Sequence, residues 1–297
     1  MLMLIRPLLI FGLIRSKSCF QITETRNFVT KIVTKFENKK NQFQYLSDVH
    51  VDTRINCLKH LDVIPKCGTL LIAGDIGSPF HENFDIFIGR MSRRFNKVIF
   101  VAGNHEYESG CLFDQNNYII GLAQIKKICK SFPNVFFLDN DVHIHDSNTI
   151  IAGTTLWTNP NIPFNMRCNI KINKCHSNTN KIEAVDAYDT HVKKHNECLD
   201  FINNACKKFY DKNVIVLSHY VPTFKLIEKK FLSQQGLGNG WFATNLDHLM
   251  KKPIRAWICG HSHSDIETNI NDVFCGINAY GYKNDNSKMI TTKTFSL

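Results

Sequence analysis

Eight short apolar runs, separated by helix-like stretches, restrict the fold of this chain more than any other feature of its sequence. The runs cover residues 43–48, 69–75, 97–105, 134–140, 149–157, 213–220, 255–263 and 272–280. Several are continuously apolar instead of alternating, which is the pattern of strands covered on both faces. Helical spacing with little Gly or Pro is found in residues 80–95, 115–131 and 181–211. This alternation predicts a layered α/β domain.

Two longer segments interrupt the alternation of strands and helices. Residues 158–180 are rich in Asn and turn formers, and residues 221–250 contain a Gln-Gln-Gly-Leu-Gly-Asn-Gly stretch. Structureless segments of this length are uncommon in compact domains unless they serve a site. We therefore expect functional loops or small caps in both places.

The positive charge of the chain is concentrated at its start. Residues 1–42 hold eight Lys or Arg and two Glu, which is +6 of the net charge of +10. A basic leader therefore explains the charge better than a basic binding face. The leader opens with a fourteen-residue apolar stretch broken by Arg6 and Pro7, shorter than the roughly 18–20 residues of a membrane span.

The chain is accordingly predicted to comprise an N-terminal extension, residues 1–42, and one folded domain, residues 43–297. No stable membrane span is expected, while targeting or weak anchoring by the leader stays an open alternative. The eleven cysteines are scattered and form no Cys-x-x-Cys pair. Free thiols of this kind favour a reducing compartment, so we expect an intracellular, cytoplasmic protein.

Five of the eight strand-like runs end in side chains that bind metals. The residues at these ends are Asp48 and His50, Asp75, Asn104 and His105, His219, and His261 and His263. Function gathers at the carboxyl ends of strands in α/β sheets, and buried polar groups there are costly unless they are paired or coordinated. One such end alone is explained more simply by a structural histidine. Five in one chain predict a shared site.

The residue types at these ends indicate the chemistry. Imidazole suits Zn, Fe, Ni and Mn, whereas carboxylate and amide oxygens suit harder ions. A mixture of His, Asp and Asn therefore fits a hydrolytic site better than a Cys-rich structural zinc site. The ligands suffice for two ions, and two ions about 3.5–4 Å apart clamp the attacking and leaving oxygens of a phosphoryl displacement.

In order and spacing these blocks resemble the calcineurin-like metallophosphoesterases, over residues 43 to about 282. The blocks are Asp48-Val49-His50, Gly74-Asp75, Gly103-Asn104-His105-Glu106, His219 and Gly260-His261-Ser262-His263. The resemblance extends to small stand-alone phosphoesterases of bacteria, protists and large DNA viruses, which share the Gly-Thr-Thr-Leu-Trp of residues 153–157 and a late Gly281-Tyr282. The resemblance implies a two-sheet β-sandwich core flanked by helices, with ligands on loops at the carboxyl ends of the strands.

The resemblance also implies a role for each matched residue. One divalent ion would be held by Asp48, His50, Asp75 and His263, and a second by Asp75, Asn104, His219 and His261. Asp75 would bridge the two ions, whose identity (Mn, Fe, Zn or Ni) is left open. A hydroxide between the ions would be the nucleophile. His105 would not be a ligand, but would protonate the leaving oxygen or steady the transition state.

These residues predict a metal-dependent phosphoesterase acting on a small phosphomonoester or phosphodiester, with a nucleotide among the candidates. The second block continues as Ile76-Gly77-Ser78-Pro79 and lacks the arginine of the Ser/Thr protein phosphatases, which argues against that class. One alternative is a DNA nuclease of the same superfamily, although the modest charge beyond the leader disfavours it. Another is a binding scaffold without catalysis, although such scaffolds typically lose ligands and every position here is filled.

Overall fold

The computed structural model describes residues 39, 41–53, 58, 61–108, 113–161, 181–229, 240–282 and 289–297. Most of the predicted leader lies outside the described residues, so the domain boundary between residues 42 and 43 stays a prediction. Residues 162–180 and 230–239, which belong to the two predicted loops, also lie outside them. The same holds for the side chains of residues 181–185.

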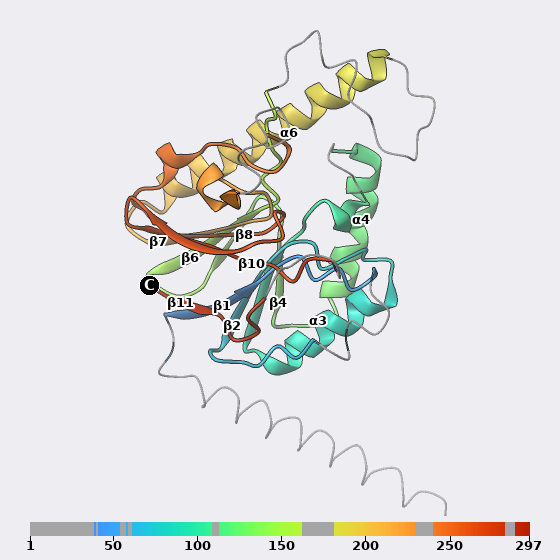
Figure 1. Ribbon diagram of the computed structural model, residues 1–297. Helices are drawn as coiled ribbons and strands as arrows, with labels where there is room; N and C mark the ends of the chain where they lie inside the picture. Colours follow the sequence, from blue (N-terminus) through green and yellow to red (C-terminus); the bar gives the residue numbers. More distant parts are fainter. Residues whose placement is uncertain are drawn as a thin grey trace, which may run out of the picture.

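Two β-sheets form the centre of the molecule (Figure 1). The first has the strand order β11-β1-β2-β3-β4. Its members are β1 (Gln42–Leu46), β2 (Thr69–Ala73), β3 (Lys97–Val101), β4 (Val135–Leu138) and β11 (Thr294–Ser296). Strands β1 to β4 run parallel, and β11 pairs antiparallel with β1 at one edge.

The second sheet has the order β5-β6-β7-β8-β10-β9. Its members are β5 (Asp141–Ile144), β6 (Thr149–Thr154), β7 (Asn213–Ser218), β8 (Ile254–Cys259), β9 (Asp265–Ile270) and β10 (Val273–Asn278). The four central strands are parallel, and β5 and β9 are antiparallel edges. Each of the eight predicted runs matches one strand, although β1 and β8 begin one residue earlier than predicted, whereas β5, β9 and β11 were not predicted.

Among the described residues, three helices cover the outer faces of the sheets. They are α3 (Glu82–Arg94), α4 (Gln115–Cys129) and α6 (Lys181–Lys208), in good agreement with the predicted helical stretches. Figure 1 shows α3 and α4 beside the first sheet and α6 across the second. Short 3₁₀ turns follow several strands: η2 (His105–Tyr107), η3 (Phe224–Leu226) and η5 (Asp247–Leu249). Within the described parts of the chain, no helix combines the length and apolarity needed to cross a membrane.

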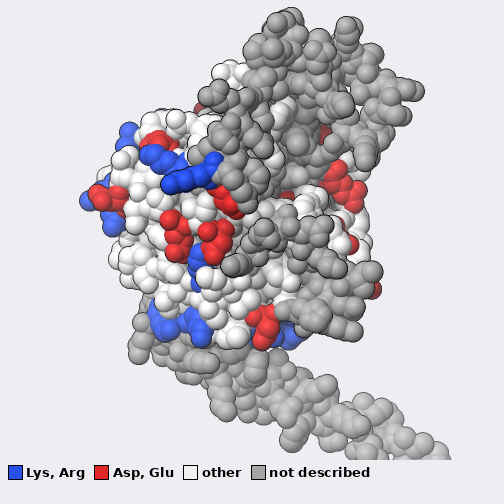
Figure 2. Space-filling view, in the orientation of Figure 1, with Lys and Arg blue, Asp and Glu red and all other residues white. Residues whose placement is uncertain are grey.

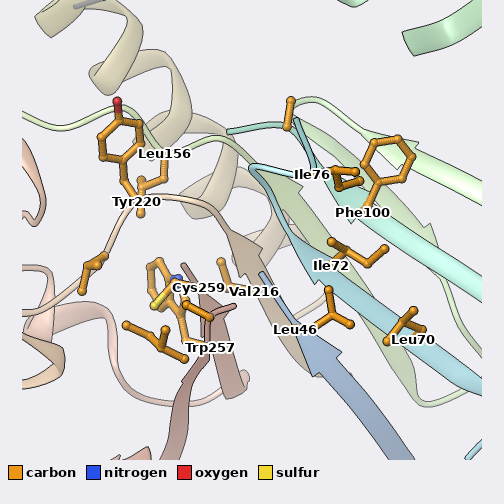
Figure 3. Close-up of a cluster of buried hydrophobic side chains, with 14 of the residues drawn as sticks. Leu46, Leu70, Ile72, Ile76, Phe100, Leu156, Val216, Tyr220, Trp257 and Cys259 are labelled. Atoms are coloured by element: carbon orange, nitrogen blue, oxygen red, sulfur yellow. The ribbon is translucent and has the colours of Figure 1, made fainter. Parts of the chain in front are cut away.

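Alternate residues of the strands pack in opposite directions, which produces the layers. On β2, Leu71 and Ala73 join a cluster with residues of β7 and β8, so this cluster lies between the two sheets. Leu70 and Ile72 of the same strand belong instead to the cluster that includes side chains of α3, α4 and α6. Figure 3 shows members of this second cluster on both sheets, among them Trp257 of β8. The predicted two-sheet sandwich flanked by helices is confirmed.

Candidate metal centre

The predicted site residues follow the carboxyl ends of five parallel strands, β1, β2, β3, β7 and β8. The loop after β1 lies alongside the loop after β2, because Asp48 N–H donates to the carbonyl of Gly74 (3.0 Å) and His50 N–H to that of Asp75 (3.1 Å). A corresponding bond joins the ends of β7 and β8, from Gly260 N–H to the carbonyl of His219 (2.9 Å). Backbone pairing therefore continues past the strands and sets the positions of the side chains.

Several of these residues have a left-handed backbone conformation that non-glycine residues rarely adopt. The φ angles are 53° at Asp48, 47° at His50, 52° at Asp75, 65° at His261 and 50° at His263. Each such residue costs about 1–3 kcal/mol, and strain of this kind concentrates at functional sites. Five of the predicted ligands have this strained conformation, which indicates that the loops are shaped to place these side chains.

Glycines let the backbone approach the carboxylates closely. A Cβ atom on Gly103 would lie 2.1 Å from Asp75 Oδ1, and one on Gly260 would lie 2.7 Å from Asp48 Oδ2. Both distances are far below van der Waals contact, so neither position has room for a side chain. The glycines of the third and fifth blocks thus shape the pocket for its two aspartates.

A first group of potential ligands comprises Asp48, His50 and His263, whose ligand atoms lie within 4.8 Å of one another. The Nε2 atoms of the two histidines are 3.1 Å apart, and His263 Nε2 is 3.5 Å from Asp48 Oδ1. Asp75 Oδ2 is 3.8 Å from His50 Nε2. The four residues predicted to hold the first ion are therefore brought together.

A second group comprises Asp75, His219 and His261, also within 4.8 Å of one another. His219 Nε2 lies 3.1 Å from His261 Nδ1, 3.2 Å from Asn104 Oδ1 and 3.4 Å from Asp75 Oδ1. The two oxygens of Asp75 thus face different groups, Oδ1 the second and Oδ2 the first. This is the position that a bridging carboxylate requires.

The hydrogen bonds of His219 show that Nε2, the ring nitrogen that faces the site, carries a lone pair. His219 Nδ1 lies 2.9 Å from the carbonyl oxygen of Ala73, which accepts but cannot donate. The proton therefore resides on Nδ1, leaving Nε2 bare toward the site. Nε2 then faces the Asn104 amide oxygen, another atom with a lone pair, across 3.2 Å. Lone pairs that converge at this distance fit a cation placed between them.

The environment also favours the neutral imidazole at two of the ligands, His50 and His261, as metal binding requires. Burial lowers the pKa of His50 to about 3 and that of His261 well below its ordinary value. Burial alone would raise the pKa of Asp75, but the surrounding histidines, His219 foremost, lower it below its ordinary value. Two neutral imidazoles and an ionised Asp75 carboxylate are ligands that fit divalent ions.

His105 occupies a different position from the other histidines of the site. It begins η2, its N–H donates to Asp75 Oδ1 (3.0 Å), and its side chain is 35% exposed. His105 Nε2 is 4.0 Å from Asp75 Oδ2, so the ring borders both the metal centre and solvent. His105 also forms a third group of potential ligands with His50 and Asp75, whose ligand atoms lie within 4.8 Å of one another. A partly exposed ring beside Asp75 is placed to reach a molecule bound at the site.

Glu106 is a residue whose role the sequence did not reveal. Its carboxylate is fully buried and accepts hydrogen bonds from the backbone N–H groups of Asp75 (3.0 Å), Ile76 (2.6 Å), Gly77 (3.3 Å) and Gly103 (2.7 Å). It therefore joins the loop that carries Asp75 to the loop that carries Asn104. Its place in the Gly-Asn-His-Glu block was the available signal, but three of its four backbone donors lie 29 to 31 positions away in the chain.

Tyr282 was the second such residue. Its hydroxyl lies 2.8 Å from His105 Nε2, and its ring stacks on His50. The sequence marked Gly281-Tyr282 as a late block without assigning it a function. Its position after β10, a parallel strand next to β8, explains why the tyrosine reaches the same edge of the sheets.

Comparison with known proteins agrees with the fold. The family model for calcineurin-like phosphoesterases matches residues 45–265. A relative, the uncharacterized protein L509 of Acanthamoeba polyphaga mimivirus, is 27% identical over 265 residues, covering 82% of this chain and 91% of its own.

A solved structure with the same fold is that of the phosphopantetheinyl hydrolase PptH of Mycobacterium tuberculosis, with a TM-score of 0.55. It is 15% identical, and the superposition covers 83% of this chain and 93% of the other. At this identity the likeness concerns the fold. The match of the family model across most of the described domain establishes that the chain belongs to the calcineurin-like phosphoesterase family.

Proposed function

We propose that this protein is a hydrolase of small phosphate esters, monoesters or diesters, that uses two divalent ions. The observation that carries the proposal is the position of Asp75 between two overlapping groups of ligands. One of its oxygens faces His219 and the other faces His50. A carboxylate shared in this way holds two ions close enough to act on one phosphate group.

In this proposal the two ions have the ligands that the sequence predicted. The first is held by Asp48, His50, Asp75 and His263, and the second by Asp75, Asn104, His219 and His261. When bound, such ions polarise the phosphoryl oxygens and lower the pKa of water at the site. The protein's own contribution is to fix these ligands on strained loops and to keep the imidazoles of His50 and His261 neutral by burial.

His105 is the proposed general acid. As the bond between phosphorus and the leaving oxygen breaks, that oxygen takes a proton from the imidazolium of His105. The partly exposed ring, with its Nε2 4.0 Å from Asp75 Oδ2, borders the space between the ligand groups and solvent. Proton transfer by a positioned side chain contributes about 10²–10⁴-fold to the rate.

The charge on the described part of the face shown in Figure 2 favours a small ester over DNA as the substrate. Figure 2 shows Lys and Arg side chains interspersed with Asp and Glu over the described part of this face, with no continuous basic stretch there. Nucleases that follow a DNA backbone rely on clustered positive charge. A DNA nuclease and a binding scaffold without catalysis remain the competing functions, and the experiment below separates them.

The experiment is a hydrolysis panel with the purified full-length chain after loading with Mn²⁺. The substrates are p-nitrophenyl phosphate, bis-p-nitrophenyl phosphate, cyclic nucleotides, a phosphopantetheinyl ester, phosphopeptides and single-stranded DNA. We expect turnover of small esters that EDTA abolishes. Degradation of DNA without turnover of small esters would assign a nuclease, and a metal-loaded chain inactive on the whole panel would favour the scaffold.

A further inference from the structure

We propose that Tyr282 is a positioning residue that holds the imidazole of His105 toward the metal centre. The inference rests on the proposed function, in which His105 delivers the proton to the leaving oxygen. Tyr282 contacts both His105 and two of the proposed ligands of the first ion. Tyr282 therefore links the proposed general acid, His105, to ligands of the first ion.

The backbone before Tyr282 is tied to the end of β1. Tyr280 N–H donates to the carbonyl of Ser47 (3.0 Å), and Gly281 N–H donates to that of Asp48 (2.9 Å). Gly281 has φ of +65°, a conformation that glycine adopts without penalty and that turns the chain at this point. Tyr282 is thus delivered by the loop after β10 to the strand end that bears the first ligands.

The ring of Tyr282 is held by two of the histidines. It stacks on His50 with a centroid distance of 4.3 Å and an interplanar angle of 24°. It meets His263 edge to face, at 4.8 Å and 66°. Aromatic pairs at these separations contribute about 0.5–1.5 kcal/mol beyond the area they bury. A ring packed on two ligands becomes more rigid once a metal fixes those ligands.

The hydroxyl of Tyr282 lies where it can orient His105. The backbone N–H of His105 is bonded to Asp75, but that bond does not hold the imidazole, which meets His50 edge to face at 4.6 Å. The hydroxyl is 2.8 Å from His105 Nε2, the nitrogen that also faces Asp75. A hydroxyl accepts from a protonated nitrogen and donates to a bare one, so it restrains the ring in either protonation state.

The orientation matters because Nε2 must face the leaving oxygen when the ester bond breaks. A protonated Nε2 can share its hydrogen between two acceptors, as in a three-centre bond. The Tyr282 oxygen and the leaving oxygen are then partners of the same N–H. Removing the phenol oxygen leaves the acid in place but lets its ring turn away from the substrate.

The test compares Tyr282→Phe, which keeps the stacked ring, with the wild type in the metal-loaded full-length chain. For alkyl phosphates, whose leaving groups need protonation, we expect kcat to fall about three- to tenfold, the worth of one hydrogen bond. For p-nitrophenyl esters the fall should be much smaller. In a His105→Ala background, Tyr282→Phe should cause no further loss, and metal content should be unchanged throughout.

Tyr210→Phe is the matched control, because Tyr210 is 78% exposed and is neither a proposed ligand nor a neighbour of His105 in the structure. A measurement independent of turnover is the rate at which diethyl pyrocarbonate modifies His105, which is monitored by peptide mass spectrometry. The rate should rise in Tyr282→Phe, since Nε2 loses its partner, and should stay unchanged in Tyr210→Phe.

Equal losses for both kinds of leaving group, or an additive loss in the His105→Ala background, would overturn the proposed role of Tyr282. So would an unchanged modification rate. Should the wild type bind metal but hydrolyse no ester, the proposed function fails, and the modification rate still decides whether Tyr282 restrains His105.

Discussion

Replacing Gly103 by alanine should disrupt the metal centre without removing a single ligand. The added methyl carbon would lie 2.1 Å from Asp75 Oδ1 and 2.7 Å from both Cε1 and Nε2 of His219. Gly103 itself offers no ligand atom, since its only polar groups belong to the backbone. The substitution therefore tests whether the close approach of this backbone shapes the site.

The size of the effect follows from these distances. Ordinary contact begins at 3.4 Å, so the Asp75 carboxylate must retreat by more than about 1 Å. Metal–ligand distances tolerate only about 0.2 Å, and Asp75 faces both groups of ligands. A misplacement of about 1 Å near the chemistry costs on the order of 10²-fold in rate. Overpacking should also destabilise the fold by about 1–3 kcal/mol.

The assay is metal content by mass spectrometry of the Mn²⁺-loaded protein, with bis-p-nitrophenyl phosphate hydrolysis and thermal unfolding measured on the same sample. Gly89→Ala is the control, because Gly89 lies in α3 and a methyl carbon there would be 3.3 Å from the Phe132 ring. We expect Gly103→Ala to lose metal and activity together and Gly89→Ala to keep both. A Gly103→Ala protein with its full metal complement and wild-type turnover would show that the close approach of this backbone does not shape the site.

Three further predictions concern other residues. His105→Ala should keep its metal yet lower turnover by about 10²–10⁴-fold, whereas Asp75→Ala should lose metal and activity; equal metal loss in both variants would remove His105 from the acid role. Glu106→Ala should lower the melting temperature and the metal content, because each buried N–H left without a partner costs about 1–3 kcal/mol, and Glu106→Gln should lose less; wild-type melting of Glu106→Ala would contradict this. Burial and His195 lower the pKa of His191 to about 3, so the folded state loses stability as pH falls from about 6.5 toward that value, by up to about 1.4 kcal/mol per unit. Urea unfolding at about pH 7 and about pH 5 should show a smaller loss for His191→Gln than for the wild type, and equal losses would be the contrary result.

The central strands could be predicted because they are buried on both faces. Every residue of β2, Thr69–Ala73, is buried. A continuous apolar run of this kind is typical of a strand that is covered on both faces, so the sequence predicts it. The edge strands were missed because their partners, and not their own composition, make them strands. Asp141–Ile144 of β5 is half-exposed or exposed throughout, and Asp265–Ile270 of β9 is mostly polar.

The residues of the site could be predicted because metal ligands are chemically distinctive, but their supports could not. Asp75 and His219 were visible as polar residues at the ends of apolar runs. Glu106 accepts only backbone donors, whose positions depend on how the loops lie in space. Tyr282 reaches His105 across 177 positions of the chain, a proximity that depends on the order of strands in the second sheet.

If Asp75 joins two metal ions, anomalous diffraction from a crystal of the Mn²⁺-loaded protein should reveal both of them. We predict two anomalous peaks about 3.5–4 Å apart, one beside each oxygen of the Asp75 carboxylate, with His50 and His263 around the first and His219 and His261 around the second. A single peak, or two peaks of which neither contacts Asp75, would contradict the account.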